Sequence, residues 1–428
     1  MAMSDFKALG SADRLTKAAV ASLYVAVLVF LFGLRSGLLK AIVFGLAAGL
    51  EIVAAVILLR SQSVRETAGR GLRRIALPAI AAGLYVAALW ISGLRIGGLR
   101  EVEPAAIATV LLGLLFLVLP VLVRDRNGLL FSVRAYVGAG LATVLISWGL
   151  LMAELLAGLG WGVARPAKLV YEKKAIMEAL GLPFILKGPF LHPNVLGMLA
   201  AGLIAGLMIL RAGERRIVIR RLETGALVLC GLTIAASLSI IAAIPALFTA
   251  AGMTLFARSR IWDRGIRAAA VAGILFFNFA AAFGLRLDFL LRLPIRSWVR
   301  IELWTQAVAS IRANPTWGIG QSGVNRLLPF HLSSHNTMIE AALGRGIPAM
   351  ILASLILIWL LLRLPPDRDP LSRGILHLVL AAVFLQAFEV LPLGSLWIMS
   401  ADMLALALPL AALAGASPTA LDSPPGPP

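Results

Sequence analysis

The chain has 428 residues, of which 60% are hydrophobic and only 14% are charged. So few polar side chains cannot cover such an apolar core, which excludes an ordinary water-soluble globule and indicates an integral membrane protein. The net charge of +18 would favour a nucleic-acid ligand in a soluble protein. Here most basic residues lie in short connectors between apolar runs, where they set membrane orientation, so we expect no nucleic-acid partner.

Apolar runs recur along the whole chain at the length that a membrane helix needs, which is roughly 20 residues. Ten runs reach or approach it: 18–34, 37–59, 75–94, 105–123, 136–159, 190–210, 268–285, 347–362, 375–392 and 395–413. The uncharged run 224–257 is too long for one span, so we expect two short helices that turn between Ser237 and Pro245. The expected fold class is an all-α integral membrane protein, a single polytopic membrane domain over residues 1–428 with about 12 transmembrane helices.

Basic connectors fall on alternate sides of this layout. Those at 60–74, 124–134, 211–221, 258–267 and 363–373, with the amino-terminal tail, hold more than half of the 39 Lys and Arg, and they predict the cytoplasmic face. The opposite, periplasmic face has two long loops, residues 160–189 and residues 286–346, the second including the start of the following helix. Residues 414–428 are rich in Pro and Ser and are expected to form a disordered cytoplasmic tail.

The large loop concentrates groups that bind anions and move protons. Since a neutral imidazole can take a proton from a hydroxyl near pH 7, His335 is the candidate catalytic base. The alternative is a histidine that only completes a helix start. Arg296 and Arg300 lie four apart and would share one face of a helix, where both reach one phosphate. The alternative for them is snorkelling to lipid headgroups.

Further candidates lie at two predicted helix starts that face the same side. Pro193 suits the first turn of the sixth span, where His192 and Asn194 either bind a phosphate or sugar hydroxyl or cap the helix, with Lys187 close by. Before the tenth span, Thr337 and Glu340 have capping-box spacing, and Glu340 either closes that box or orients His335. Trp304 either stacks on a sugar or anchors the interface.

No metal site or other cofactor is expected. The single cysteine, Cys230, excludes a site built on several thiolates, and paired carboxylates at ligand spacing are absent from both long loops. Arginine would therefore have to neutralise a leaving group where other enzymes use a divalent cation.

A motif in the large loop resembles that of the O-antigen ligase family and its wider superfamily of polysaccharide polymerases and protein-glycosylating ligases. The residues that carry the resemblance extend over about fifty positions: Arg300-x-x-x-Trp304, Ala307, Pro315, Gly318-x-Gly320, His335-Asn336 and Gly346. The rest of the chain agrees with the family only in hydropathy and in the large outer loop before the histidine.

The resemblance implies an enzyme of the bacterial inner membrane, a multi-pass protein whose active site faces the periplasm. Such an enzyme transfers O-antigen glycan from an undecaprenyl diphosphate carrier to a sugar hydroxyl of the lipid A-core oligosaccharide, without metal or nucleotide. The family's essential histidine falls on His335 and its loop arginine on Arg300, with Arg296 as the alternative and with Asn336 and Trp304 beside them in the site.

One departure concerns the seventh span, where family members often carry a Ser-Arg pair and this chain reads Ser237-Leu-Ser239. Another cation must then cover the carrier phosphate, and Lys187 and Arg292 are the candidates. Two alternatives to the ligase stay open: a polymerase or protein-glycosylating ligase of the same superfamily, and a transporter of a lipid-linked anion, which would need charged residues through its spans and symmetry between its halves. The sequence leaves the oligomeric state undetermined.

Overall fold

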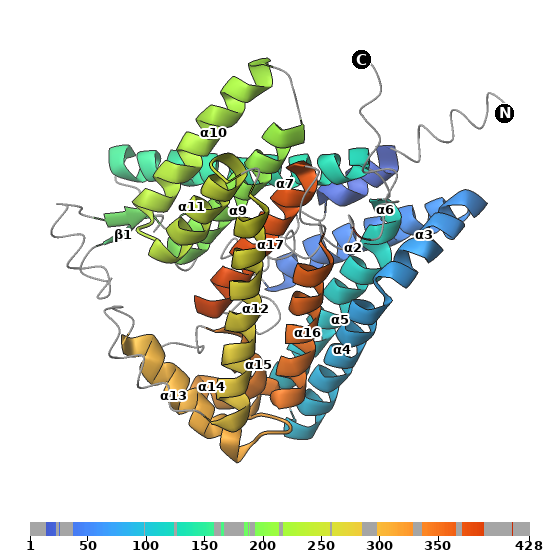
Figure 1. Cartoon of the computed structure of the whole chain (residues 1–428), viewed down its shortest axis with the longest axis vertical. Helices are drawn as coiled ribbons and strands as arrows, with labels where there is room; N and C mark the ends of the chain where they lie inside the picture. Colours follow the sequence, from blue (N-terminus) through green and yellow to red (C-terminus); the bar gives the residue numbers. More distant parts are fainter. Residues whose placement is uncertain are drawn as a thin grey trace.

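The chain folds almost entirely into helices in the computed structural model (Figure 1). The structure describes residues 14–22, 25, 37–97, 99–123, 126–157, 164–166, 184–186, 188, 193–213, 217–256, 259–284, 298–327, 336–364, 370–388 and 413, and at some helix ends only their backbone. The expected tail 414–428 and nearly all of the last expected span, 395–413, lie outside these residues. The all-α class is confirmed.

The first half of the described chain includes its longest helix, the 32 residues Arg126–Ala157. The helices of this half have the bounds α2 Gly37–Leu59, α3 Gln62–Arg74, α4 Ala76–Ile96, α5 Leu99–Gly113, the π-helix η1 Leu114–Val118, α6 Leu119–Leu122 and α7 Arg126–Ala157. The π-helix precedes Pro120, which has no N–H for the carbonyl of Phe116 and whose ring would clash with it. Wider i→i+5 hydrogen bonds in η1 accommodate that defect without ending the helix.

The second half contains both long and short helices. After a two-stranded antiparallel pair, β1 Ala164–Pro166 and β2 Phe184–Leu186, follow α9 Pro193–Gly213, α10 Ile217–Ala236, α11 Ile240–Thr254, α12 Arg260–Phe283, α13 Trp298–Ala313, α14 Gly320–Leu327, α15 Thr337–Arg345, α16 Ile347–Arg363 and α17 Pro370–Phe388. The run 224–257 divides between α10 and α11 as predicted, at a turn where Leu238 has a φ of 47°. Pro245 lies inside α11 rather than in the turn.

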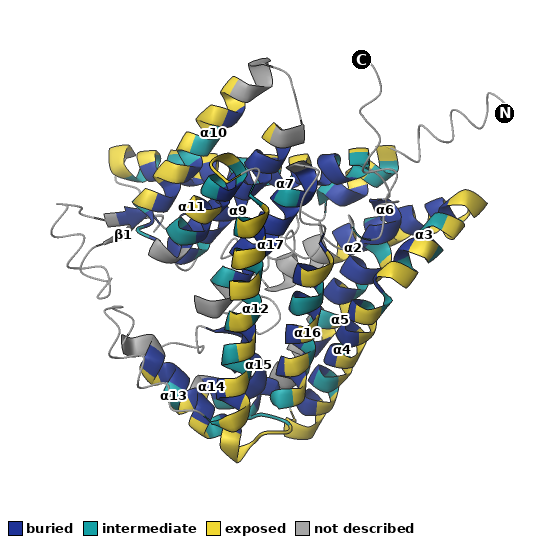
Figure 2. Ribbon diagram, in the orientation of Figure 1, coloured by how far each residue is buried: buried dark blue, intermediate teal, exposed yellow. Residues whose placement is uncertain are grey.

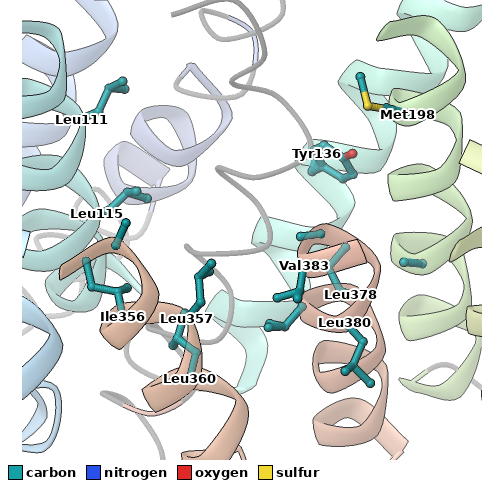
Figure 3. Packing of buried hydrophobic residues seen from close by; sticks show 14 of the residues in the cluster. Leu111, Leu115, Tyr136, Met198, Ile356, Leu357, Leu360, Leu378, Leu380 and Val383 are labelled. Carbon is teal, nitrogen blue, oxygen red and sulfur yellow. The ribbon is translucent and has the colours of Figure 1, made fainter. Parts of the chain in front are cut away.

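The helices pack in two groups that α12, α15 and α17 join. In one group α9 is almost wholly buried and contacts α7, α10, α11 and α17; in the other α4 contacts α5 and α16. Figure 3 shows core residues of both, among them Leu115 of η1, Ile356 of α16, Tyr136 of α7 and Met198 of α9. Short α15 lies between the groups, and all nine of its residues are buried.

Many large apolar side chains are exposed, among them Leu77, Leu156, Leu247 and Phe283, as expected for a surface that faces lipid. Figure 2 marks the exposed positions of the outer helices in yellow. Among the described residues, four helical segments are long and apolar enough to span a membrane: Ala76–Ile96, Arg126–Leu156, Pro193–Arg211 and Arg260–Phe283. A fifth results if Gly45–Leu59 and Gln62–Arg74, bent by 115°, count as one span. The transmembrane character is thus supported, whereas the expected number of about 12 spans is not confirmed.

The two ends of α12 define two ends of the molecule. At its start, capped by Ser259, Asp263 bonds to Arg373 of α17, and Arg267 donates to the carbonyl of Leu364 after α16. At its other end, Gly284 lies against the side chain of Arg312 of α13. The start of α12, the end of α16 and the start of α17 therefore share one end, and α13 and α14 lie at the opposite end (Figure 1).

Candidate functional site

Two glycines of the large-loop motif join α13 to the junction of α15 and α16. The segment 315–319, between α13 and α14, lies along this junction, with Ile319 N donating to Leu343 O at 2.8 Å and Ile347 N donating to Pro315 O at 2.7 Å. Gly318 and Gly346 have φ values of 66° and 89°, which side chains disfavour. The two positions 28 residues apart in the sequence are thereby fixed against one another.

Neither glycine has room for a side chain. A Cβ on Gly318 would lie 2.5 Å from Leu343 O and 2.6 Å from Arg345 N, and one on Gly346 would contact the backbone carbonyl of Thr316. These neighbours are backbone atoms, which cannot turn aside as a side chain can. The motif glycines thus serve a close approach of two backbones, and this approach holds the arginine-bearing helix α13 beside α15.

The start of α15 differs by one residue from the prediction. Asn336, not Thr337, is the N-cap, and its Oδ1 accepts hydrogen bonds from Met338 N and Ile339 N, both at 3.0 Å. The predicted capping box of Thr337 and Glu340 is therefore wrong, because Ile339 occupies the third helical position. Asn336 is fully buried and its side-chain oxygen is engaged by the helix.

Trp304 lies in the protein core. It is 3% exposed and its ring meets that of Phe277 of α12 edge-on, with centroids 5.1 Å apart. Buried Ile301, Ala307 and Val308 of the same helix surround it in the sequence. Stacking on a sugar stays a prediction that would require this packing to open.

Glu340 and Arg345 bring two charged side chains into the buried helix α15, with exposed fractions of 2% and 7%. Burial of charged groups requires compensation by partners, and both residues make interactions with their surroundings. Glu340 lies one turn after Asn336, so its predicted role in orienting His335 stays a prediction.

The structure describes only some of the other predicted site residues. Arg300 is the third residue of α13, where its backbone is described. His335, Arg296, Arg292, Lys187 and His192 lie outside the described residues. Asn194 is the second residue of α9 and is buried, and Pro193 is the first, as predicted.

A second region forms around the start of α9. A Cβ on Gly197 would lie 2.5 Å from Ser239 Cβ and 2.9 Å from Ser237 Oγ, so the first turns of α9 touch the turn between α10 and α11. This is the turn at which the resemblance to the O-antigen ligase family leads us to expect a Ser-Arg pair. Gly188, which follows Lys187, similarly lies against Ser147 of α7 and Leu196 of α9. The first turns of α9, which include Asn194, thus contact the turn 237–239, and α13, which bears Arg300, contacts α15, which begins after its N-cap Asn336.

An open apolar groove of about 580 Å³ lies between α12 and α16. Leu275, Phe279 and Phe283 line it from α12, and Met350 and Ile351 line it from α16. At its polar position Asn278 Nδ2 donates to Ser354 Oγ at 2.8 Å, and Ser354 Oγ also lies 2.9 Å from Met338 Sδ of α15. The groove therefore adjoins the helix that Asn336 starts.

Sequence reasoning missed a buried ionic cluster at the other end of α12. The carboxylate of Asp263 is bonded by Arg373, and His377 Nε2 lies 3.5 Å from Asp263 Oδ1. Gly252 of α11 faces the imidazole, and a Cβ there would lie 2.5 Å from Nε2. The only sequence signal was the four-residue spacing of Arg373 and His377, which places them on one face of α17.

No group of three or more His, Cys, Asp and Glu side chains that could hold a metal ion occurs in the part of the chain that the structure describes. The sequence matches no protein-family model, and a comparison with curated proteins gives no match.

Proposed function

We propose that the protein is a membrane glycosyltransferase of the O-antigen ligase type. In this proposal it moves O-antigen glycan from an undecaprenyl diphosphate carrier to a sugar hydroxyl of the lipid A-core oligosaccharide, at the periplasmic face of the bacterial inner membrane. The observation that carries it is the close backbone approach at Gly318 and Gly346, because those motif residues hold α13, which bears Arg300, against α15, which follows His335.

The protein supplies the two kinds of surface that binding of the carrier requires, one cationic and one apolar. Arg300 and Arg296 bind its diphosphate, with Arg292 or Lys187 covering the charge that the Ser-Arg pair neutralises in related enzymes. His192 and Asn194 bind a phosphate oxygen or sugar hydroxyl, and Asn336 and Glu340 position the start of α15 beside the reacting sugar, while Trp304 packs in the core against Phe277. The apolar groove between α12 and α16 accepts part of the polyprenyl tail, since it is lined by Leu, Phe, Met and Ile side chains and opens to the outside.

The reaction is a single displacement. The acceptor oxygen forms a bond to the anomeric carbon as the bond from that carbon to the carrier phosphate breaks, and His335 takes the proton of the attacking hydroxyl. The carrier diphosphate leaves with the bonding electron pair, stabilised by arginine rather than by a metal. Attack from the face opposite the leaving group inverts the anomeric configuration.

The test uses purified protein in proteoliposomes with a lipid-linked glycan and lipid A-core acceptor, and it measures the glycosidic product. We expect His335→Ala to abolish product formation and to leave carrier binding intact, because a base acts only in the transition state. Arg300→Lys is expected to weaken carrier binding, because lysine keeps the charge but loses the planar two-pronged donor.

His331→Ala is the matched control, since it removes a second imidazole from the same loop and has no assigned role. If His335→Ala formed product as fast as His331→Ala, His335 would not be the catalytic base. Product formed on a second carrier-linked chain in place of lipid A-core would make the protein a polymerase.

A further inference from the structure

Helix α3 has two chemically distinct faces. Val64, Ala68 and Gly71 are buried on one side, and α3 contacts α4 and α6. Arg65, Arg70 and Arg73 are exposed on the other side. At 3.6 residues per turn these arginines and Gly69 fall on one face, opposite the buried one.

The helices on either side place α3 at a membrane boundary. α3 turns away from α2 by 115°, somewhat more than a right angle, so it lies across the direction of the apolar helix before it. Val56 and Ile57 near the end of α2 and Leu77 and Ile80 near the start of α4 are exposed large apolar side chains. Two surfaces suited to acyl chains thus end where α3 begins and ends, as expected for a helix at the depth of lipid headgroups.

The arginines on this face are not used by the fold. Among the described residues, the side chains of Arg65 and Arg73 make no hydrogen bond or ion pair, and the side-chain contact of Arg70 is a long one of 3.4 Å from Nη2 to Thr67 Oγ1. The one carboxylate on the helix, Glu66, accepts a hydrogen bond from Gln62 Nε2 at 3.0 Å. A shallow open hollow of about 690 Å³ lies over the face, lined by Gln62, Arg65, Glu66, Gly69, Arg70 and Arg73.

We propose that Arg65, Arg70 and Arg73 form a binding surface for the phosphate groups of anionic phospholipids. Guanidinium groups donate paired, charge-assisted hydrogen bonds to phosphate oxygens, and long arginine side chains reach the headgroup layer while their stems lie along the helix. Because Gly69 has no side chain, a headgroup can approach the middle of the face and contact the arginines on both sides of it. The flanking apolar side chains select a lipid over a soluble anion, since acyl chains lie against them while the phosphate is held.

The experiment counts lipids bound to the purified full-length protein in neutral detergent by native mass spectrometry, as phosphatidylglycerol is titrated. Each arginine near the surface is expected to contribute about fivefold in affinity, so Arg65→Gln, Arg70→Gln and Arg73→Gln combined should weaken binding by roughly 100-fold. Lysine at the same three positions should bind more strongly than glutamine, because the charge remains, but more weakly than arginine, because the paired guanidinium hydrogen bonds are lost. Phosphatidylcholine should bind wild type and the triple glutamine variant equally.

The matched control removes three other exposed arginines, on three separate helices: Arg221→Gln, Arg264→Gln and Arg363→Gln. It should bind phosphatidylglycerol like wild type. Equal loss in the two triple variants would mean general charge attraction and would overturn the proposal. So would binding of inorganic phosphate, or of an RNA oligonucleotide, at the affinity of phosphatidylglycerol. Unchanged gel-filtration profiles show that the variants are folded.

Discussion

Arg373 donates two hydrogen bonds to Oδ2 of the fully buried Asp263, from Nε at 3.0 Å and from Nη2 at 2.7 Å. The pair ties α17 to α12, and His377 lies beside it within the packing of α11. A buried ion pair adds little over an apolar pair, but loss of one partner leaves a buried charge without compensation. The cluster therefore makes the relative position of α12 and α17 sensitive to any single change in it.

Asp263→Ala should lower the free energy of unfolding by about 3–5 kcal/mol, because Arg373 loses its counter-charge. Cys230 is the only cysteine and is buried, so unfolding can be followed by its reaction with a thiol-reactive fluorophore on heating. The neighbouring exposed Arg264→Gln should leave the unfolding temperature nearly unchanged. An Asp263→Ala protein as stable as Arg264→Gln would show that the cluster does not hold the two helices.

Gly346→Ala should cost about 2–5 kcal/mol, since alanine disfavours a φ of 89° and its Cβ would contact the carbonyl of Thr316. The same thiol assay measures this loss. Gly83→Ala on α4 is the control, because nothing lies within 4 Å of its Cβ position and alanine favours a helix. If the two alanine variants unfold at the same temperature, the close approach of 315–319 to the α15–α16 junction is not rigid.

Asn336→Ala should destabilise the protein by about 1 kcal/mol, because the amides of Met338 and Ile339 lose their acceptor. Asn336→Ser should retain most of this stability, as a serine hydroxyl also caps helices. Comparison of unfolding with glycan transfer separates two roles. A serine variant that is stable but inactive would indicate contact with substrate, whereas parallel loss of both properties would indicate a cap alone.

Trp304→Ala should cost about 3–5 kcal/mol through the cavity left against Phe277, and Trp304→Phe should cost distinctly less. Unfolding of both variants in detergent measures this difference. A ring that stacks on sugar would instead leave stability nearly unchanged and raise KM for the acceptor. That second pattern would contradict the core position of Trp304.

Sequence patterns predicted the features that depend on local chemistry. Hydropathy gave the helical class and the division of 224–257 into α10 and α11, and the fixed φ of proline placed Pro193 at the first position of α9. The resemblance of the residues around Arg300 and His335 to a ligase motif stays a prediction, but its two glycines, Gly318 and Gly346, do lie where the segments before α14 and α16 meet.

Features that depend on distant contacts were not predictable. Asp263 and Arg373 are separated by 110 positions, and no pattern in either helix reveals the other. The N-cap is Asn336 and not the predicted Thr337. Both residue types can cap a helix, and only the fold determines which backbone amides need an acceptor. The number of spans could not be fixed from hydropathy for a similar reason, and about 12 stays a prediction. The helices α11 and α16 are mainly apolar but have only 15 and 17 residues, and hydropathy does not distinguish burial within the protein from burial in lipid.

The π-helix between α5 and α6 has a consequence for comparison with related chains. Its five residues, Leu114–Val118, hold one residue more than a regular α-helical path would use. A relative that lacks one residue here would continue as an ordinary α-helix, and its side chains beyond this point would be rotated by roughly 100°. Alignment of such a relative therefore needs a single gap inside this helix, not in a loop.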